Sequence, residues 1–118
     1  MPYMRVSLTQ KLTPEKAGEL NKRLSEAFEV LPGKTRDFII IELEDGKPLF
    51  FRSEFQKDFI FADIHYAGKF AFKLKNELTV AIFGVFESVL GTAKENASLK
   101  ITEHQSWGAL GELHDTLY

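Results

Sequence analysis

Few residues in this chain of 118 residues are of a type and spacing that could do chemistry. The chain has no cysteine, which excludes a disulfide framework, a thiolate zinc site and a catalytic cysteine. Its histidines, His65, His104 and His114, are scattered, and it lacks a glycine-rich phosphate loop and a serine nucleophile elbow. His65 alternates with Asp63 on one strand face, which favours a hydrogen-bonded structural histidine over a catalytic one. We therefore expect no catalytic triad, no metal site and no cofactor.

The remaining candidate for a catalytic group is Pro2. A proline is small enough to permit removal of Met1, and removal would expose a secondary amine at the start of a strand. The pKa of a free α-amino group is about 8, and burial lowers it because burial disfavours the charged form. Such an amine could accept a carbon-bound proton at neutral pH. With Met1 retained, the Pro2 nitrogen is an amide and cannot act as a base.

Two cations after the first predicted helix could hold an anion. Removing a proton beside a carbonyl requires a cation or a hydrogen-bond donor at the developing enolate oxygen. Lys34 could supply it, or it could be a cation stabilised by the dipole at the end of the helix. Arg36 has a planar fork suited to bidentate pairing with a carboxylate, or it is a solvated loop cation. The residue types alone leave these alternatives open.

The elements that must position these residues follow a strand–helix–strand pattern twice. Hydrophobic periodicity predicts main strands over residues 3–8, 37–43, 59–66 and 98–104, and helices over residues 14–31 and 69–90. A short edge strand is expected over residues 49–51, and a glycine-containing tail over residues 107–118. The pattern predicts one α/β domain over residues 1–118, duplicated at approximately 1–57 and 58–118. Its two βαβ units would form a four-stranded mixed sheet with both helices on one face.

Burial patterns add three expectations about this sheet. The strand over residues 37–43 is a β-branched apolar run, which predicts a central position with cover on both faces. The second helix is apolar nearly all round in its middle, which predicts deeper burial than that of the first. Because the pattern of residues 38–43 and 59–64 is too apolar to leave a face in water, we expect sister subunits to cover that face. Self-association is therefore expected.

Charge and hydropathy exclude some classes of partner. Fifteen Lys and Arg against seventeen Asp and Glu give a net charge of −2, so no basic excess drives nucleic-acid binding. The longest uncharged stretch of mainly apolar residues, 78–86, falls far short of the roughly 20 residues that span a bilayer. The N-terminus lacks the pattern of a secretory signal, which makes a cytoplasmic location the default expectation.

Several short motifs, taken in order, resemble the tautomerase superfamily. They are the proline start, the βαβ duplication, Gly33-Lys34, the run Ile64-His65-Tyr66-Ala67-Gly68-Lys69, and Ser106-Trp107. The likeness covers nearly the whole chain and is greatest to the branch of macrophage migration inhibitory factor and D-dopachrome tautomerase. It implies a homotrimer with sheets packed around a central axis. It also implies a proline general base in a pocket between subunits.

The resemblance also assigns roles to individual positions. Pro2 matches the catalytic base, and Lys34 matches the lysine that holds a substrate carboxylate or carbonyl oxygen. Ala67 falls where the family has an isoleucine whose backbone amide faces the pocket. Lys100 and Thr102 stand where the inhibitory-factor branch has a tyrosine and an asparagine. Lys100 would favour an anionic substrate, although an exposed strand lysine is an equal alternative.

The leading hypothesis from the sequence is a keto–enol tautomerase of small α-keto acids, phenylpyruvate-like, that needs no cofactor. Its partners would be a small carboxylate or α-keto acid and further copies of itself. A dehalogenase or decarboxylase of small acids is an alternative that would use a protonated proline with Arg36 and Lys100. The alternative from another class is a non-enzymatic trimeric binding or signalling protein, because a fold does not fix a function.

Overall fold

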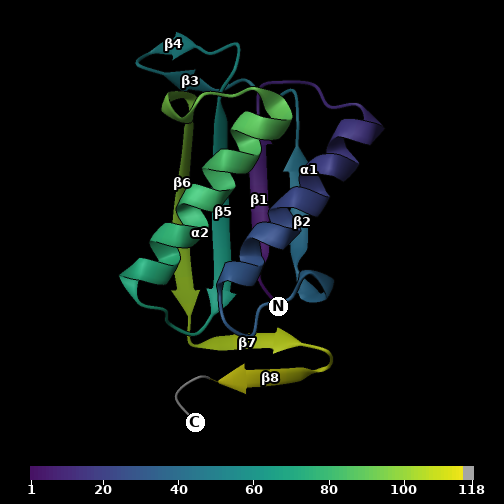
Figure 1. The fold of residues 1–118 in the computed structure, drawn as a ribbon, viewed down its shortest axis with the longest axis vertical. Coiled ribbons are helices and arrows are strands. Elements are labelled where there is room, and N and C mark those ends of the chain that lie inside the picture. Colours follow the sequence, from purple (N-terminus) through teal and green to yellow (C-terminus); the bar gives the residue numbers. More distant parts are fainter. Residues whose placement is uncertain (116–118) are drawn as a thin grey trace.

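The fold is a four-stranded sheet with two helices on one of its faces (Figure 1). It is seen in a computed structural model that describes residues 1–115. The sheet contains β1 (Tyr3–Leu8), β2 (Ile40–Glu44), β5 (Ile60–Ala67) and β6 (Ala97–His104), in the order β2-β1-β5-β6. β1 is parallel to β2, β5 is parallel to β6, and the two halves meet at the antiparallel pair of β1 and β5. The predicted α/β class, the mixed sheet and the two βαβ units are confirmed.

Local signals mark the start of α1 and the end of the second helical segment. α1 (Pro14–Ala27) starts with a proline, and the Thr13 side chain accepts a hydrogen bond from the Lys16 backbone N–H at 3.1 Å. α2 (Phe72–Val85) continues into a π-helical turn at Phe86–Leu90, which ends at Gly91 with a positive φ of 70°. α2 starts three residues later than predicted, because Ala71 is still extended.

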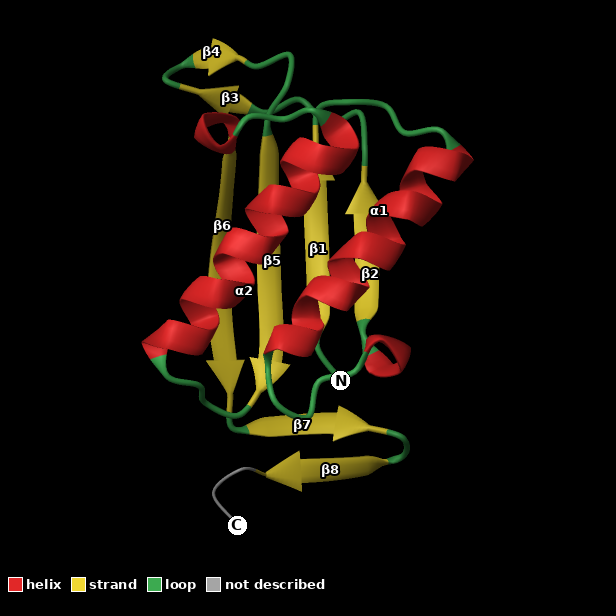
Figure 2. Cartoon of the chain, in the orientation of Figure 1, coloured by secondary structure: helices red, strands yellow, loops and turns green. Residues whose placement is uncertain are grey.

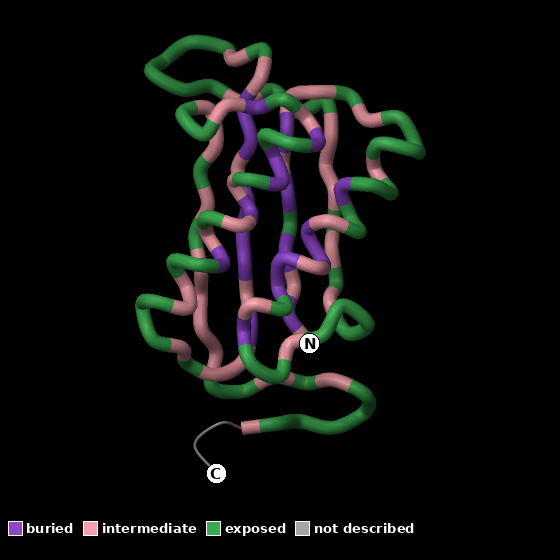
Figure 3. The backbone as a smooth tube through the Cα atoms, viewed as in Figure 1, coloured by how far each residue is buried: buried purple, intermediate pink, exposed green. Residues whose placement is uncertain are grey.

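The core lies between the helices and one face of the sheet, where β1 and β5 carry the buried strand positions (Figure 3). Alternate residues of β1 and β5 point to this side, as the period of a strand requires. The fully buried members include Met4, Val6, Leu8, Ile60, Ala62, Ile64 and Tyr66 from the strands, and Leu20, Leu24, Leu78 and Ile82 from the helices. This layer holds the fold together.

The strand predicted to be central lies at the edge of the sheet. β2 pairs only with β1 in the sheet order, and residues 36–38 ahead of it form a 3₁₀ turn. Ile39, Ile41 and Leu43 pack against the core, whereas Ile40 on the other face is 48% exposed. The prediction of cover on both faces is therefore wrong for this chain, since the apolar run supplies only one buried face.

α2 is not more buried than α1, contrary to the sequence-based expectation. Phe72 and Val80 on α2 are 78% and 62% exposed. Each helix packs on the sheet with one side only, and Figure 2 shows no further layer in front of them. Apolar residues on all sides of α2 therefore do not lead to burial on all sides, because a helix in a two-layer fold has only one packing face.

The uncovered sheet face is charged rather than apolar. Tyr3, Arg5, Asp63, His65 and Lys100 occupy the alternate positions of β1, β5 and β6 that face away from the helices. Most apolar residues of these strands point to the core instead, although Phe61 shares the open face. The argument that this face is too apolar for water is therefore wrong, and self-association needs other support.

Two hairpins extend the molecule at opposite ends (Figure 1). β3 (Phe50–Phe51) and β4 (Glu54–Phe55) pair with each other, so residues 49–51 are not an edge of the main sheet. β7 (Ser106–Ala109) and β8 (Glu112–Asp115) form the second hairpin, which crosses the end of the sheet near the N-terminus. The predicted tail is thus ordered as far as Asp115, and its last part, 116–118, lies outside the described residues. No helix within residues 1–115 is long and apolar enough to cross a membrane.

Candidate active site

A hollow at the N-terminal end of β1 brings together two of the site residues predicted from the sequence, and Pro2 itself is buried beside it without being one of the lining residues. Met1, which precedes Pro2, lines it together with Lys34 and Ala67. Its volume is about 340 Å³. We call it the lysine hollow; its full lining is Met1, Gly33, Lys34, Phe38, Ala67, Trp107, Ala109, Leu110 and His114.

A tight turn after α1 aims Lys34 into this hollow. Gly33 has a positive φ of 78°, a conformation that a residue with a Cβ rarely adopts, and the Lys34 N–H donates to the Leu31 carbonyl at 3.1 Å. The Lys34 Nζ donates to the Ala67 carbonyl at 3.3 Å and lies 6.0 Å from the centre of the Phe70 ring. The lysine is thereby held between the turn and the end of β5.

The electrostatics of the lysine hollow disfavour additional positive charge. Burial lowers the pKa of Lys34. The pKa of the Met1 amino group is also lowered, mainly by burial and further by the Lys34 charge. Two part-buried cations close to each other favour loss of a proton from one of them or arrival of an anion. The hollow therefore suits a neutral amine beside a cation that binds an anion.

Arg36, Lys100 and Thr102 do not line the lysine hollow of this chain. Arg36 forms ion pairs with Glu29 at 2.9 Å and Glu26 at 3.5 Å, and its hydrogen bonds with Glu29 raise its pKa. Lys100 lies on the open sheet face, and Thr102 pairs with His65 in the register of β5 and β6. The structure therefore brings Lys34 and Ala67 to the N-terminus and leaves the other three candidates elsewhere.

Sequence reasoning missed the wall that the C-terminal hairpin contributes. Trp107 and His114 are partners across β7 and β8, and both line the lysine hollow with Leu110. Leu110 and Gly111 form the hairpin turn, both with positive φ. The alternation around two glycines in this tail is the signal that could have predicted a hairpin. Its position across the end of the sheet depends on tertiary packing that no local pattern encodes.

A second hollow lies on the open-face side of the N-terminus. It measures about 530 Å³, and we call it the histidine hollow because His65 and His104 line it; the other lining residues are Met1, Tyr3, Ile40, Trp107 and Gly108. Met1 and Trp107 line both hollows. The two therefore adjoin at the N-terminal residue.

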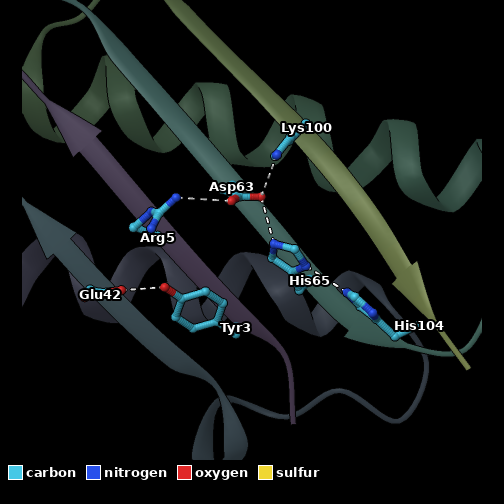
Figure 4. Close-up of polar contacts among 7 residues, drawn as sticks. All are labelled: Tyr3, Arg5, Glu42, Asp63, His65, Lys100 and His104. Carbon is cyan, nitrogen blue, oxygen red and sulfur yellow. Dashed lines mark hydrogen bonds and ion pairs between the residues drawn. The ribbon is translucent and has the colours of Figure 1, made fainter. Parts of the chain in front are cut away.

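The histidine hollow borders a polar network on the open sheet face (Figure 4). Asp63 Oδ1 lies 2.9 Å from His65 Nε2, and His65 Nδ1 lies 2.8 Å from His104 Nε2. Arg5 and Lys100 approach the same carboxylate at 3.5 Å and 3.8 Å. Within residues 1–115, however, no three His, Asp or Glu side chains converge in a way that could hold a metal ion.

Tyr3 belongs to the same face but has a different partner. Its hydroxyl donates a hydrogen bond to Glu42 on the edge strand β2 (Figure 4), and this bond raises its pKa. Its ring centre lies 6.0 Å from that of His65. The open face is therefore linked laterally from β2 to β6.

Comparisons with known proteins were made for the whole chain. No protein-family model matches the sequence, and a search of curated proteins finds no match. Among solved structures, Leishmania major MIF2 shares 18% identity at a TM-score of 0.86, over 96% of this chain and 97% of that one. Pt0534 inactivated by 2-oxo-3-pentynoate shares 16% identity at a TM-score of 0.85, over 98% and 97%. A fused 4-OT symmetric trimer shares 17% identity at a TM-score of 0.85, over 98% and 96%.

The chain has the fold of macrophage migration inhibitory factor and other tautomerase-superfamily proteins. Because all these identities are below 20%, the likeness establishes this fold and leaves the chemistry to be argued from the site. The resemblance predicted from short motifs is confirmed at that level.

In this tautomerase-superfamily fold, Glu103 fixes the end of the sheet beside Ala67. Its carboxylate accepts hydrogen bonds of 2.8 Å from the Tyr66 hydroxyl and from the Phe70 backbone N–H, and Lys75 lies 3.7 Å away. Burial alone would raise the pKa of Glu103, but these hydrogen bonds and the cation lower it overall. The segment that joins β5 to α2 is thereby tied to β6, which holds one wall of the lysine hollow in place.

Proposed function

We propose that the chain, after removal of Met1, is a keto–enol tautomerase of small α-keto acids with Pro2 as the general base. The observation that carries this proposal is that Met1, which directly precedes Pro2, lines one hollow with Lys34. Burial lowers the pKa of both the Met1 amino group and Lys34, and removal of Met1 would leave Pro2 as the terminal amine beside this lysine. A neutral amine and a nearby cation are the two groups that enolisation beside a carbonyl requires.

The mechanism follows from these two groups. The Pro2 nitrogen takes the proton from the carbon next to the ketone, and the electrons of that C–H bond move into the new C=C bond. The former carbonyl oxygen gains negative charge, which Lys34 stabilises by charge and hydrogen bonding. The protonated Pro2 amine then gives its proton to that oxygen, which completes the enol and restores the neutral amine, and no external oxidant or reductant takes part.

The lining of the lysine hollow supports a substrate with a carboxylate and an apolar end. Lys34 offers the cation, while Phe38, Trp107 and Leu110 offer apolar surface. A volume of about 340 Å³ fits a small molecule such as a phenylpyruvate-like acid. One structure of the same fold is that of a protein inactivated by 2-oxo-3-pentynoate, which is itself a small α-keto acid.

We also propose that the protein is a homotrimer, formed from single-domain copies of residues 1–118. Phe38, Phe50, Phe55 and Leu110 are each more than half exposed, and such apolar surface favours a protein partner. A structure of the same fold is a symmetric trimer. In this arrangement Lys100 and Thr102 would reach the lysine hollow of a neighbouring copy. Sedimentation equilibrium tests the proposal: a monomer at micromolar concentration would contradict it.

The structure bears differently on the two alternative functions that the sequence left open. A dehalogenase or decarboxylase needs further cations near the proline, and Arg36 is held away by Glu26 and Glu29. A non-enzymatic binding trimer is favoured wherever Met1 is retained. Met1 then lines both hollows, and the Pro2 nitrogen is an amide that cannot act as a base. For any of these functions we propose a cytoplasmic location.

The decisive experiment combines intact mass with a covalent probe. Mass spectrometry of the protein from its native host shows whether Met1 is removed. The processed protein should then gain the mass of one 2-oxo-3-pentynoate molecule through attack of the Pro2 amine on the conjugated alkyne. Pro2→Gly should reduce phenylpyruvate enolisation by about 10² to 10⁴, the range for a general base. Pro48→Ala, a proline in a turn remote from the hollow, is the matched control.

The pH dependence separates the base from its alternatives. A neutral-amine base is lost by protonation, so kcat/KM should fall as pH decreases through the pKa of the Pro2 amine. An enzyme that uses protonated proline should instead lose kcat/KM as pH rises. Unchanged kcat/KM for Pro2→Gly with Met1 absent would refute the proposed base.

A further inference from the structure

The proposed mechanism leaves the His65–His104 pair without a role, although it borders the N-terminal residue. The ring nitrogens of the pair are 2.8 Å apart, so one carries a proton and the other offers a lone pair. The rings are stacked, with centres 5.0 Å apart and planes at 28°. A pair in this state can accept a proton on one ring and shift the shared proton to the other.

Asp63 places a carboxylate against the outer nitrogen of this pair. The residue is only 8% exposed, and its enclosed Oδ1 makes no aligned hydrogen bond within residues 1–115. That oxygen is 2.9 Å from His65 Nε2, the ring nitrogen that His65 does not share with His104. Arg5 and Lys100 share the carboxylate from longer distances and are about half exposed, which weakens their competition.

The opposite side of the N-terminus has the reverse character. There, burial and Lys34 disfavour a charged terminal amine. If the Pro2 amine is exposed to the same surroundings after processing, a proton on it is repelled by Lys34 and attracted to the lone pair and carboxylate on the histidine side. Met1 lines both hollows, so the residue whose removal exposes the Pro2 amine borders both sets of side chains.

We propose that Asp63, His65 and His104 form a proton relay that receives the proton from the Pro2 amine. This inference rests on the proposed role of Pro2 as the base. The N–H bond on Pro2 breaks as an N–H bond forms on the histidine pair, and the positive charge moves next to Asp63. The proton count is unchanged, and the reverse transfer returns a proton for the next step.

The other charged and titratable groups at the relay come from each neighbouring strand. β1 contributes Arg5 and Tyr3, the edge strand contributes Glu42 through Tyr3, and β6 contributes Lys100. On the hairpin, the Trp107 ring packs edge-on against His104 at 5.5 Å and 66°. Trp107 is the single tryptophan of the chain, so its fluorescence reports the state of the pair.

The test measures the coupling between amine and relay in the processed protein. The Pro2 amine is titrated by NMR with ¹⁵N-labelled proline in the wild type and in variants of the histidine pair. His104→Phe keeps the ring contact with Trp107 but removes the acceptor, so it should lower the amine pKa by about half a unit, roughly threefold in the equilibrium. His65→Gln should shift it in the same direction. Ser98→Ala, on the same face of β6 but outside the relay, is the matched control.

A second readout follows the proton during turnover. In D₂O, the relay passes the substrate proton to solvent, so deuterium incorporation per enolisation event should fall about threefold or more in His104→Phe. An amine that titrates identically in wild type, His104→Phe and His65→Gln overturns the relay, whether or not the protein is an enzyme. Normal enolisation without coupling leaves the tautomerase proposal standing and removes the relay. Coupling without enolisation or probe adduct supports the relay as a proton network and removes the tautomerase proposal.

Discussion

The two faces of the sheet differ in almost every property although they alternate residue by residue along the same strands. Met4 and Ile64 on the helix-covered face are fully buried, whereas Arg5 and Asp63, their neighbours in sequence, belong to an ion-pair network on the open face. Burial of apolar surface stabilises the first face in proportion to its area, while exposed ion pairs contribute little. The covered face thus holds the fold, and the open face is free to hold charge and protons.

The largest effect that sharpens this comparison is expected on the covered face. Ile64→Ala should lower the free energy of unfolding by about 2–5 kcal/mol. Ile64 lies on β5, between β1 and β6 in the sheet, and the change removes its fully buried side chain from the core. Urea denaturation followed by circular dichroism measures it. Ser7→Ala, on the open face of β1, should stay within about 0.5 kcal/mol. Equal effects of the two changes would break the distinction between the faces.

An intermediate effect is expected from the carboxylate on the covered side. Glu103→Gln should cost about 1–3 kcal/mol, since it weakens charge-assisted hydrogen bonds from Tyr66 and Phe70. Because the folded pKa of Glu103 is depressed below 4.5, its contribution is present above that pH. It is lost as pH falls through the folded pKa. Acid titration of stability should therefore show a smaller loss in Glu103→Gln than in wild type, and identical acid profiles would contradict this account.

The smallest effect is expected on the open face. Lys100→Ala should change the free energy of unfolding by less than about 0.5 kcal/mol, because its side chain is 59% exposed and lies 3.8 Å from Asp63. The measurement is urea denaturation at low and at high salt. A loss of 2 kcal/mol or more would show that open-face ion pairs stabilise this fold as buried contacts do.

The sequence was sufficient for the fold because its signals were local and periodic. Thr13 and Pro14 mark the start of α1, and Gly91 marks the end of the second helix. The edge position of β2 was missed, since a β-branched run such as Ile39–Ile40–Ile41 reads the same at an edge and at a centre. The burial of α2 was overestimated for a related reason. The apolar character of a helix shows how much surface it can bury, but not whether another element packs against that surface.

The candidate site was predictable only in part. The turn at Gly33 fixes Lys34 locally, so its placement could be anticipated. The Asp63–His65 alternation was visible, but the approach of His104 depends on the register of β5 against β6, a non-local pairing. The wall formed by Trp107 and His114 likewise depends on where the C-terminal hairpin docks.

The position of the terminal amino group also limits how this polypeptide can be joined to others. Met1, the residue that carries this amino group, lines both the lysine hollow and the histidine hollow. Any extension upstream, whether an affinity tag or a fused domain, would turn the Pro2 nitrogen into an amide and block both hollows. Under the tautomerase proposal, an aminopeptidase that trims one residue therefore switches the enzyme on, and a gene fusion upstream of Pro2 would silence it without disturbing the fold.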